Sequence, residues 1–243
     1  GSDAGHVRIY SWDGNAWSQV GSDIDGEAAG DRSGYSVSID SDGSHVAIGA
    51  NGNDGNGSSS GHVRVYEYSS GSWSQVGNDI DGEAANDYSG SSVSIDSDGS
   101  HVAIGAYGNG SYTGHVRIYS YDGSAWTQIG SDIDGEAASD LSGQSVSIDS
   151  DGSHVAIGAH LNDGAGSNAG HVRIYAWDGE AWGQVGNDID GEASGDQSGY
   201  SVSIDSDGSH VAIGAYLNDG NGSDSGHVRI YSWDGSAWAQ VGN

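Results

Sequence analysis

The sequence predicts an all-β fold, a β-propeller built from four-stranded antiparallel blades with about 56 residues per repeat. Three observations predict it. Short runs of alternating polar and β-branched apolar residues recur along the chain, which is the pattern of strands. Asp-Gly pairs separate many of these runs, and they favour the positive φ angles of tight hairpins. The segment GHVR[IV]Y recurs five times, at Gly5, Gly61, Gly114, Gly170 and Gly226.

The repeats follow one another without a linker, so we expect one repeat domain over residues 1–243. A stacked solenoid is the main structural alternative, but hairpins inside each unit favour meandering sheets. There are four complete repeats and a half repeat, at residues 5–60, 61–113, 114–169, 170–225 and, for the partial one, 226–243.

Four strands are expected in the first unit, at residues 6–10, 17–20, 36–39 and 45–50. Asp13-Gly14 joins the first two strands, and Asp42-Gly43 joins the last two. The segments between these hairpins, which begin with DIDGEA or consist of Gly, Asn, Asp and Ser, are expected to be loops.

The composition excludes several classes of protein. The net charge is −29, from 35 acidic residues against 6 arginines, so a nucleic-acid partner is not expected. No cysteine is present, which excludes disulfides and thiolate metal sites, and no apolar run is long enough for a membrane helix. The acidity and the absence of the oxidisable residues Cys and Met fit a saline extracellular or cell-surface setting.

Residues 26–38 (GEAAGDRSGYSVS), followed by VAIGA at 46–50 and GHVRVY at 61–66, resemble the FG-GAP repeat. That repeat builds the β-propeller at the head of integrin α subunits and of related surface proteins. The resemblance covers essentially the whole chain. It implies that SVSID is the innermost strand of a blade, followed by HVAIGA and GHVRIY, with AWSQVG outermost.

The sequence departs from the family pattern at two places. Ser33-Gly34 stands where the family has Phe-Gly, and this recurs in every repeat. The hairpin that holds calcium in the family is shortened here to DSDGSH, at residues 40–45 in the first unit. A plain Asp-Gly turn is therefore expected at that hairpin.

Strand counting in the implied order leaves one half-blade unmatched. Residues 35–243 complete four blades, whereas the outer strands within residues 5–21 have no inner strands beside them. One interpretation is a segment of a longer array, and the other is a closed four-bladed ring with a two-stranded flap. Exposed sheet edges invite pairing with another chain, so self-association is expected.

The DIDGEA connections carry the densest acidic clusters. Hard cations prefer several oxygen ligands, so one hypothesis is one Ca²⁺ per unit. The alternative is a solvated connection whose carboxylates cap backbone N–H groups or pair with the repeated arginines. The candidate metal ligands are Asp23, Asp25, Glu27 and Asp31; Asp79, Asp81, Glu83 and Asp87; Asp132, Asp134, Glu136 and Asp140; and Asp188, Asp190, Glu192 and Asp196.

Three other residue types recur with the repeat. Two histidines per unit, one in GHV and one in SHV, suggest either Zn²⁺ binding or a pH switch, but their regular placement on strands favours satisfied structural positions. The arginine of GHVR is expected to pair with the acidic connection. A tryptophan on the outermost strand either covers the blade edge or stacks on sugars, at Trp17, Trp73, Trp126, Trp182 and Trp238.

No set of residues combines an acid, a base and a nucleophile, so a non-catalytic protein is expected. The predicted function is an extracellular structural or adhesive module that associates with itself through blade edges or acidic loops. One alternative is a carbohydrate-binding propeller lectin, with a glycan or a surface protein as its ligand. The near identity of the repeats also fits a consensus-designed propeller without a natural ligand.

Overall fold

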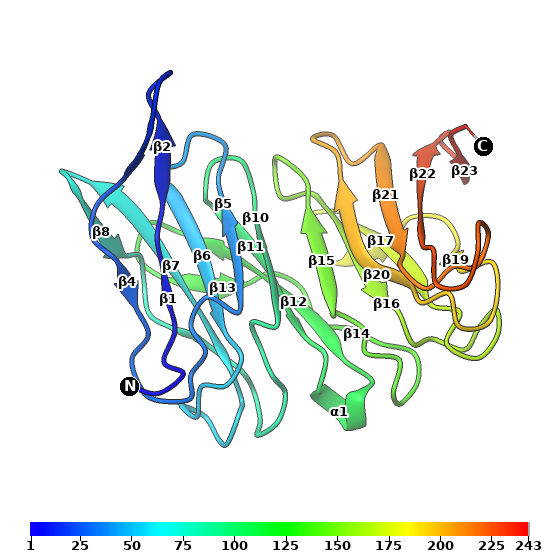
Figure 1. The fold of residues 1–243 in the computed structure, drawn as a ribbon, viewed down its shortest axis with the longest axis horizontal. Helices are drawn as coiled ribbons and strands as arrows, with labels where there is room; N and C mark the ends of the chain where they lie inside the picture. The colour runs from blue at the N-terminus through cyan, green and yellow to red at the C-terminus, as the bar shows by residue number, and fades with distance from the viewer. Residues whose placement is uncertain (243) are drawn as a thin grey trace.

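The computed structural model describes residues 1–242, and it consists almost entirely of strands and tight turns (Figure 1). The only helix within those residues is the four-residue α1 (Asn109–Tyr112). Nothing among them is a helix of the length and apolarity that crossing a membrane requires. The all-β prediction is therefore confirmed.

Four antiparallel sheets follow one another along the chain. In each, the strand order equals the chain order, so the innermost-to-outermost order that the resemblance implied is confirmed. The sheets comprise β5 (Ser36–Ile39), β6 (His45–Ala50), β7 (His62–Ser69) and β8 (Ser72–Gln75); β10 (Ser92–Ile95), β11 (His101–Ala106), β12 (His115–Tyr121) and β13 (Trp126–Gln128); β15 (Ser145–Ile148), β16 (His154–Ala159), β17 (His171–Trp177) and β18 (Trp182–Gln184); and β20 (Ser198–Ile204), β21 (His210–Ala215), β22 (His227–Trp233) and β23 (Trp238–Gln240).

Each sheet combines two neighbouring sequence repeats. The first sheet takes its inner hairpin, β5–β6, from the first repeat and its outer hairpin, β7–β8, from the second. The connection that follows each outer hairpin therefore leads to the inner hairpin of the next sheet. Each complete repeat thus supplies the outer strands of one sheet and the inner strands of the next, so the outer strands of the first repeat have no inner strands beside them.

Those first strands are β1 (His6–Val7), β2 (Tyr10–Trp12) and β3 (Trp17–Gln19), and we call them together the half sheet. β2 and β3 pair with each other, whereas β1 pairs with residues 24–25 of the connection that follows. The strand expected over residues 6–10 is broken in two. Its counterpart β12 is continuous because β11 pairs with it over six residues, and the half sheet has no such inner strand.

The start of each DIDGEA connection is a short strand rather than the expected loop. It pairs with the first residues of the GHV strand, as Ile133 does with Val116, and its isoleucine is buried. The sequence pattern did not predict these strands, because a single β-branched residue between two aspartates is too short to show the alternation typical of a strand. These strands are β4 (Ile24–Asp25), β9 (Ile80–Asp81), β14 (Ile133–Asp134) and β19 (Ile189–Asp190).

The core lies between consecutive sheets, and we call each such contact a seam. In the seam between the second and third sheets, Val116 and Ile118 of β12 pack with Val146 and Ile148 of β15. Small residues allow the close approach of inner strands. A Cβ on Gly105 would lie 2.0 Å from the carbonyl oxygen of Gly143 in the next sheet.

The array of sheets is not closed into a ring, and the first and last sheets lie at opposite sides of the molecule (Figure 1). Val228 of the last sheet is 67% exposed, whereas its equivalent Val172 is fully buried by the following sheet. Val37 of the first sheet is 53% exposed, whereas its equivalent Val93 is 8% exposed. Both ends therefore present surfaces that are covered everywhere else in the chain.

Candidate functional site at the seams

The last aspartate of each acidic connection has a structural role. Asp87 is buried, and its carboxylate accepts a hydrogen bond of 2.9 Å from the backbone N–H of Ala84, which closes the turn. At the equivalent Asp140, the carboxylate also accepts a hydrogen bond of 2.8 Å from the Nδ2 group of Asn162. Because of these contacts the carboxylate of this last aspartate points toward the backbone of its own turn. The equivalent residues are Asp31, Asp87, Asp140 and Asp196.

The second aspartate contributes its backbone. Arg117 is buried in the seam, and its Nη2 group donates a 2.8 Å hydrogen bond to the carbonyl oxygen of Asp81. The same guanidinium lies 5.5 Å from the ring centroid of Tyr119. Pairing of the arginine with the connection is thus confirmed: Arg117 donates its hydrogen bond to the backbone and lies 3.8 Å from the Glu83 carboxylate, whereas Arg8 donates to the Asp23 carboxylate. The equivalent backbone acceptors are Asp25, Asp81, Asp134 and Asp190.

The glutamate of one connection and the first aspartate of the next meet at the histidine of GHV. The Nδ1 atom of His115 lies 3.9 Å from Glu83 Oε2 and 3.7 Å from Asp132 Oδ2. All ligand atoms of such a group lie within 4.8 Å of one another. Three groups of this kind exist among residues 1–242: Glu27, His62 and Asp79; Glu83, His115 and Asp132; and Glu136, His171 and Asp188.

The sixteen predicted ligands are therefore distributed differently from the hypothesis of one site per connection. None of the groups within residues 1–242 takes both Asp132 and Asp134, because each group combines acidic residues from two different connections. The third ligand, a histidine, comes from a strand paired with one of these connections. Sequence reasoning missed this grouping because it treated the connection as a loop independent of the GHV strand.

The two histidines of a unit differ in environment. His101, of SHV, makes a 2.7 Å hydrogen bond between its Nδ1 atom and Asp96, and this bond raises the pKa of the imidazole. His115, of GHV, is 1% exposed, and burial lowers its pKa. Its Nδ1 atom is beyond hydrogen-bond distance of both carboxylates. The expectation of satisfied structural histidines thus holds for the SHV set only.

The shortened DSDGSH hairpin is a tight turn, and in the fourth unit its Asp205, Asp207 and His210 lie close enough together to hold a metal ion. The Asp98 carboxylate accepts a 3.0 Å hydrogen bond from the backbone N–H of Ser100, and the pKa of Asp98 is lowered chiefly by the Ser100 hydroxyl and also by this backbone bond. The four innermost strands converge near these hairpins around a cavity of about 180 Å³. Ser97 bridges two sheets there, because its Oγ donates a hydrogen bond to the carbonyl oxygen of Ser150.

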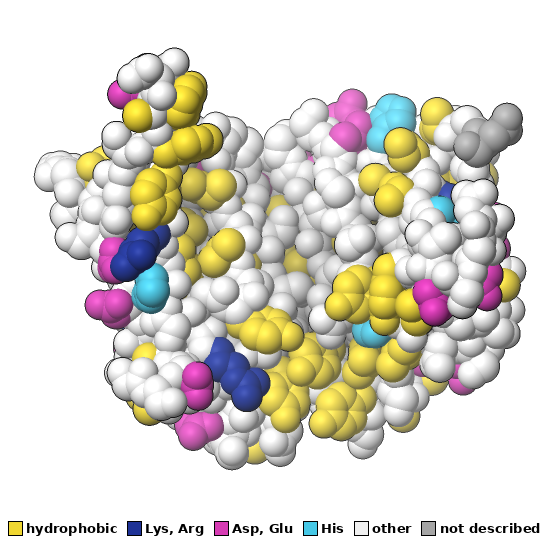
Figure 2. Space-filling view, viewed as in Figure 1, with side chains coloured by type: hydrophobic (Ala, Val, Ile, Leu, Met, Phe, Trp, Pro, Cys, Tyr) yellow, Lys and Arg dark blue, Asp and Glu magenta, His cyan; other side chains and the backbone are white. Residues whose placement is uncertain are grey.

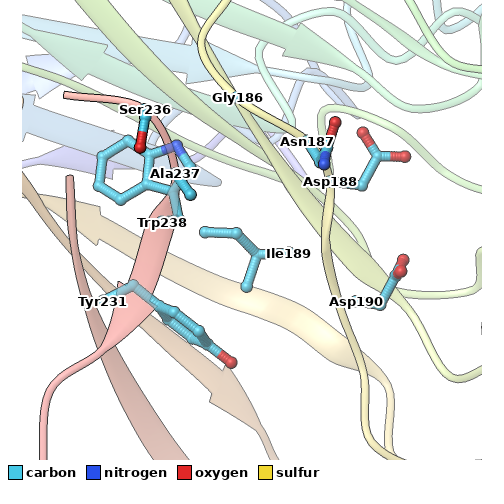
Figure 3. A pocket seen from close by; sticks show the side chains of 9 residues that line it. All are labelled: Gly186, Asn187, Asp188, Ile189, Asp190, Tyr231, Ser236, Ala237 and Trp238. Atoms are coloured by element: carbon cyan, nitrogen blue, oxygen red, sulfur yellow. The ribbon is translucent and has the colours of Figure 1, made fainter. Parts of the chain in front are cut away.

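A cleft recurs on the outer side of the seams. In the last seam its volume is about 310 Å³, and its lining includes Tyr231, Trp238 and Ile189. Figure 3 shows Ile189 pointing toward these two rings, whereas Asp188 and Asp190 project on the opposite side of the connection. The Nε1 group of Trp238 donates a 2.8 Å hydrogen bond to the carbonyl oxygen of Val185 in the preceding sheet. The tryptophan therefore joins two sheets.

Comparison with solved structures supports the propeller architecture. The periplasmic gluconolactonase PpgL of Pseudomonas aeruginosa superposes with a TM-score of 0.58 at 14% identity, covering 97% of this chain and 62% of that one. TolB of Acinetobacter baumannii superposes with a TM-score of 0.53 at 13% identity, covering 97% of this chain and 48% of that one. At these identities the likeness concerns the fold alone.

No curated protein matches the sequence. The sequence pattern of the FG-GAP repeat matches residues 22–66, 131–175 and 189–231, which together are more than half of the chain. These ranges contain the inner hairpins and the GHVR[IV]Y segments of the first, third and fourth sheets described above. The chain therefore belongs to the FG-GAP repeat family.

Proposed function

We propose that the chain is a non-catalytic structural module that joins copies of itself end to end, in an extracellular or cell-surface setting where it contributes to adhesion. The observation that carries the proposal is that the interior seams contain the partner of each exposed end. The surface setting rests on the resemblance to repeats of surface proteins and on the strongly acidic composition.

An interior seam joins aliphatic residues of one sheet to the inner strands and the outer aromatic residues of the next; the inner-strand residues are Val93, Ile95, Val102 and Ile104. Val63 and Val65 of β7 belong to one buried cluster with Tyr119, and Trp126 packs against that cluster. The Nε1 group of Trp126 also donates a 2.9 Å hydrogen bond to the carbonyl oxygen of Val76. Each interior seam therefore combines an apolar contact with one directional bond.

The trailing end holds the aliphatic side of this arrangement, and the leading end, which has no inner strands, holds the aromatic part of the other side. At the leading end, which we define as the half sheet β1–β3, Tyr10 is 47% and Trp17 is 67% exposed. Hydrophobic side chains cover the β2–β3 hairpin at the upper left of Figure 2. At the trailing end, defined as β22 and β23, Val228 and Ile230 are 67% and 46% exposed.

The hydrogen bond from a tryptophan to the preceding sheet has an unused acceptor at one end of the chain and an unused donor at the other. The carbonyls equivalent to that of Val241 each accept a bond from the tryptophan of the next sheet, and Val241 has no such donor among residues 1–242. Trp17 is the equivalent donor, and no preceding sheet lies beside it. Because the leading and trailing surfaces differ, their contact is head-to-tail and extends into chains or closes into rings.

Sedimentation velocity over a concentration series tests the proposal. The charge of −29 opposes association, so the experiment is run in salt, which screens repulsion between copies. The wild type is expected to associate as concentration rises. Trp17→Ala, which removes the leading surface, and Val228→Asp, which removes the trailing one, are each expected to stay monomeric. Tyr112→Ala is the matched control, because Tyr112 is 45% exposed but lies at neither end.

Mixing the two end variants gives the sharpest result. Trp17→Ala keeps an intact trailing end and Val228→Asp keeps an intact leading end, so their mixture is expected to form dimers and nothing larger. A wild type that remains monomeric at every concentration refutes the proposal. Equal association of the wild type and both end variants refutes it as well.

A second function, carbohydrate binding, is favoured by the recurring outer clefts. Each is lined by a tryptophan and a tyrosine beside a polar connection, and the clefts measure about 310, 280 and 170 Å³. Aromatic rings of this kind can stack on sugar rings. Titration with a glycan panel should quench tryptophan fluorescence if the clefts bind sugars, and an unchanged signal across the panel would refute this function.

A further inference from the structure

We infer that the three Glu–His–Asp groups in the interior seams bind a divalent transition metal ion of the zinc type. The groups are Glu27, His62 and Asp79; Glu83, His115 and Asp132; and Glu136, His171 and Asp188. In each group the ion would be held by one imidazole Nδ1 and two carboxylates, with a fourth position open to water.

The spacing of the three side chains is that of ligands around an ion. The Nδ1 atom of His115 is 3.7 Å from Asp132 and 3.9 Å from Glu83, and in the next group the corresponding distances are 3.7 and 3.8 Å. Hydrogen bonds between such atoms are about 2.7–3.2 Å long. Two ligands at about 2.1 Å from a tetrahedral Zn²⁺ are about 3.4 Å apart, so a small contraction around the ion suffices.

The histidine at the centre of the second group has no hydrogen bond at the nitrogen that faces the site. His115 is 1% exposed, and its Nδ1 atom lies beyond hydrogen-bond distance of both carboxylates beside it. A buried polar group without a partner is costly, and native proteins satisfy nearly all of them. The Nδ1 atom faces the two carboxylates. A bound cation would satisfy that nitrogen and both oxygens together.

The other histidine set provides an internal comparison. In SHV, the Nδ1 atoms of His45, His101, His154 and His210 lie 2.7–2.8 Å from an aspartate and are hydrogen-bonded. The exposed group of Asp205, Asp207 and His210 contains such a bonded pair, so its histidine is already satisfied. The GHV histidines face carboxylates of the same type without closing to that distance.

The ligand types select the class of ion. One imidazole and two carboxylates suit Zn²⁺ and its neighbours in the first transition series, whereas Ca²⁺ takes six to eight oxygens. The Glu83 carboxylate has one oxygen 3.8 Å from Arg117, which leaves the other for the ion. The overall charge of −29 also draws cations toward the protein.

The ends of the chain lack complete groups. His227 has Glu192 at 3.7 Å, but no aspartate completes that group among residues 1–242. At the other end, Asp23 accepts hydrogen bonds from Arg8 and Gln19, and the hydrogen bond from Arg8 lowers the pKa of Asp23 to about 2. Three ions per chain are therefore expected.

Equilibrium dialysis against Zn²⁺ alone, followed by metal analysis, tests the inference. The wild type is expected to retain three ions per chain, and Ca²⁺ in excess should not displace them. Asp79→Asn, Asp132→Asn and Asp188→Asn should each remove one ion by weakening its site at least about tenfold. These isosteric changes keep the oxygen that accepts a bond from the neighbouring glutamine.

The matched controls are Asp81→Asn, Asp134→Asn and Asp190→Asn, two residues further along the same connections and outside the groups. They should leave the stoichiometry at three. X-ray absorption of the zinc-loaded protein should show imidazole nitrogen in the coordination shell. The inference is overturned if the wild type retains no zinc, if the Asp79, Asp132 and Asp188 variants retain all of it, or if the controls lose as much as they do.

Discussion

Replacing Gly158 by alanine tests whether close approach between sheets stabilises the array. Gly158 lies on the second strand of the third sheet, and a Cβ there would sit 2.0 Å from the carbonyl oxygen of Gly199 in the fourth sheet. Its φ angle is not in the left-handed region, so alanine meets no backbone strain there. Gly214 is the equivalent residue of the last sheet, and the only neighbour its Cβ would crowd is Ser201 of its own sheet.

The magnitude follows from the distances. Contacts of a real Cβ start near 3.0 Å, so the fourth sheet must move by about 1 Å, and overpacking of this kind costs about 1–3 kcal/mol. The movement also stretches the 2.7 Å hydrogen bond from Ser145 Oγ to the Gly199 carbonyl, worth about 1 kcal/mol. We expect Gly158→Ala to cost about 3 kcal/mol. Gly214→Ala shares the contact with its own serine but lacks the second sheet, so we expect about 1 kcal/mol.

Urea denaturation followed by circular dichroism measures both variants. The midpoint of Gly158→Ala should fall clearly below that of Gly214→Ala, at equal slope. Equal midpoints would refute the reasoning, because they would show that the third and fourth sheets do not meet at Gly158 in solution. Self-association can be measured on the same variant. Gly214→Ala changes neither the leading end nor β22 and β23, so it should still associate.

Two further predictions concern single side chains in the seams. His160 is buried, burial lowers its pKa to about 4, and the unfolded chain therefore binds its proton first as the pH falls below about 6.5. Between pH 7 and pH 4 the free energy of unfolding of the wild type should fall by up to about 3 kcal/mol more than that of His160→Asn. Asparagine is chosen because it is the residue at the equivalent position 51. Urea midpoints of the two proteins that change in parallel with pH would contradict this. Trp182→Phe removes the 3.0 Å hydrogen bond to the Ile129 carbonyl and should cost about 1–2 kcal/mol in thermal denaturation, whereas Trp12→Phe, at a 52% exposed position, should change little.

Strand positions within a repeat could be predicted closely from the sequence. The expected strands at residues 36–39 and 45–50 coincide with β5 and β6, because their alternating apolar residues and the Asp-Gly turn between them fix a local hairpin. The tight turn of the shortened hairpin also followed from local chemistry. All of these features depend on residues close together in the chain.

The histidine groups could not be predicted in the same way. Glu83, His115 and Asp132 come from three separate segments, and they meet because β12 pairs with β14 while the preceding connection crosses the same seam. Sequence reasoning grouped acidic residues by proximity along the chain, whereas each group combines residues of two successive connections with a histidine of the strand between them. The information needed was the pairing of a two-residue strand, which propensity does not reveal.

The offset between repeats and sheets determines both the unpaired ends of the chain and the number of complete metal groups, but the two proposals make independent predictions. A complete metal group needs a connection before its histidine and a connection after it, and the 243 residues provide both only for His62, His115 and His171. A head-to-tail joint places the leading half sheet beside β23, and no connection of either copy lies there to supply a glutamate to His6. Zinc stoichiometry should therefore remain three per chain in monomers and in assemblies. Metal binding that rose with association would show that the joint is built differently from an interior seam.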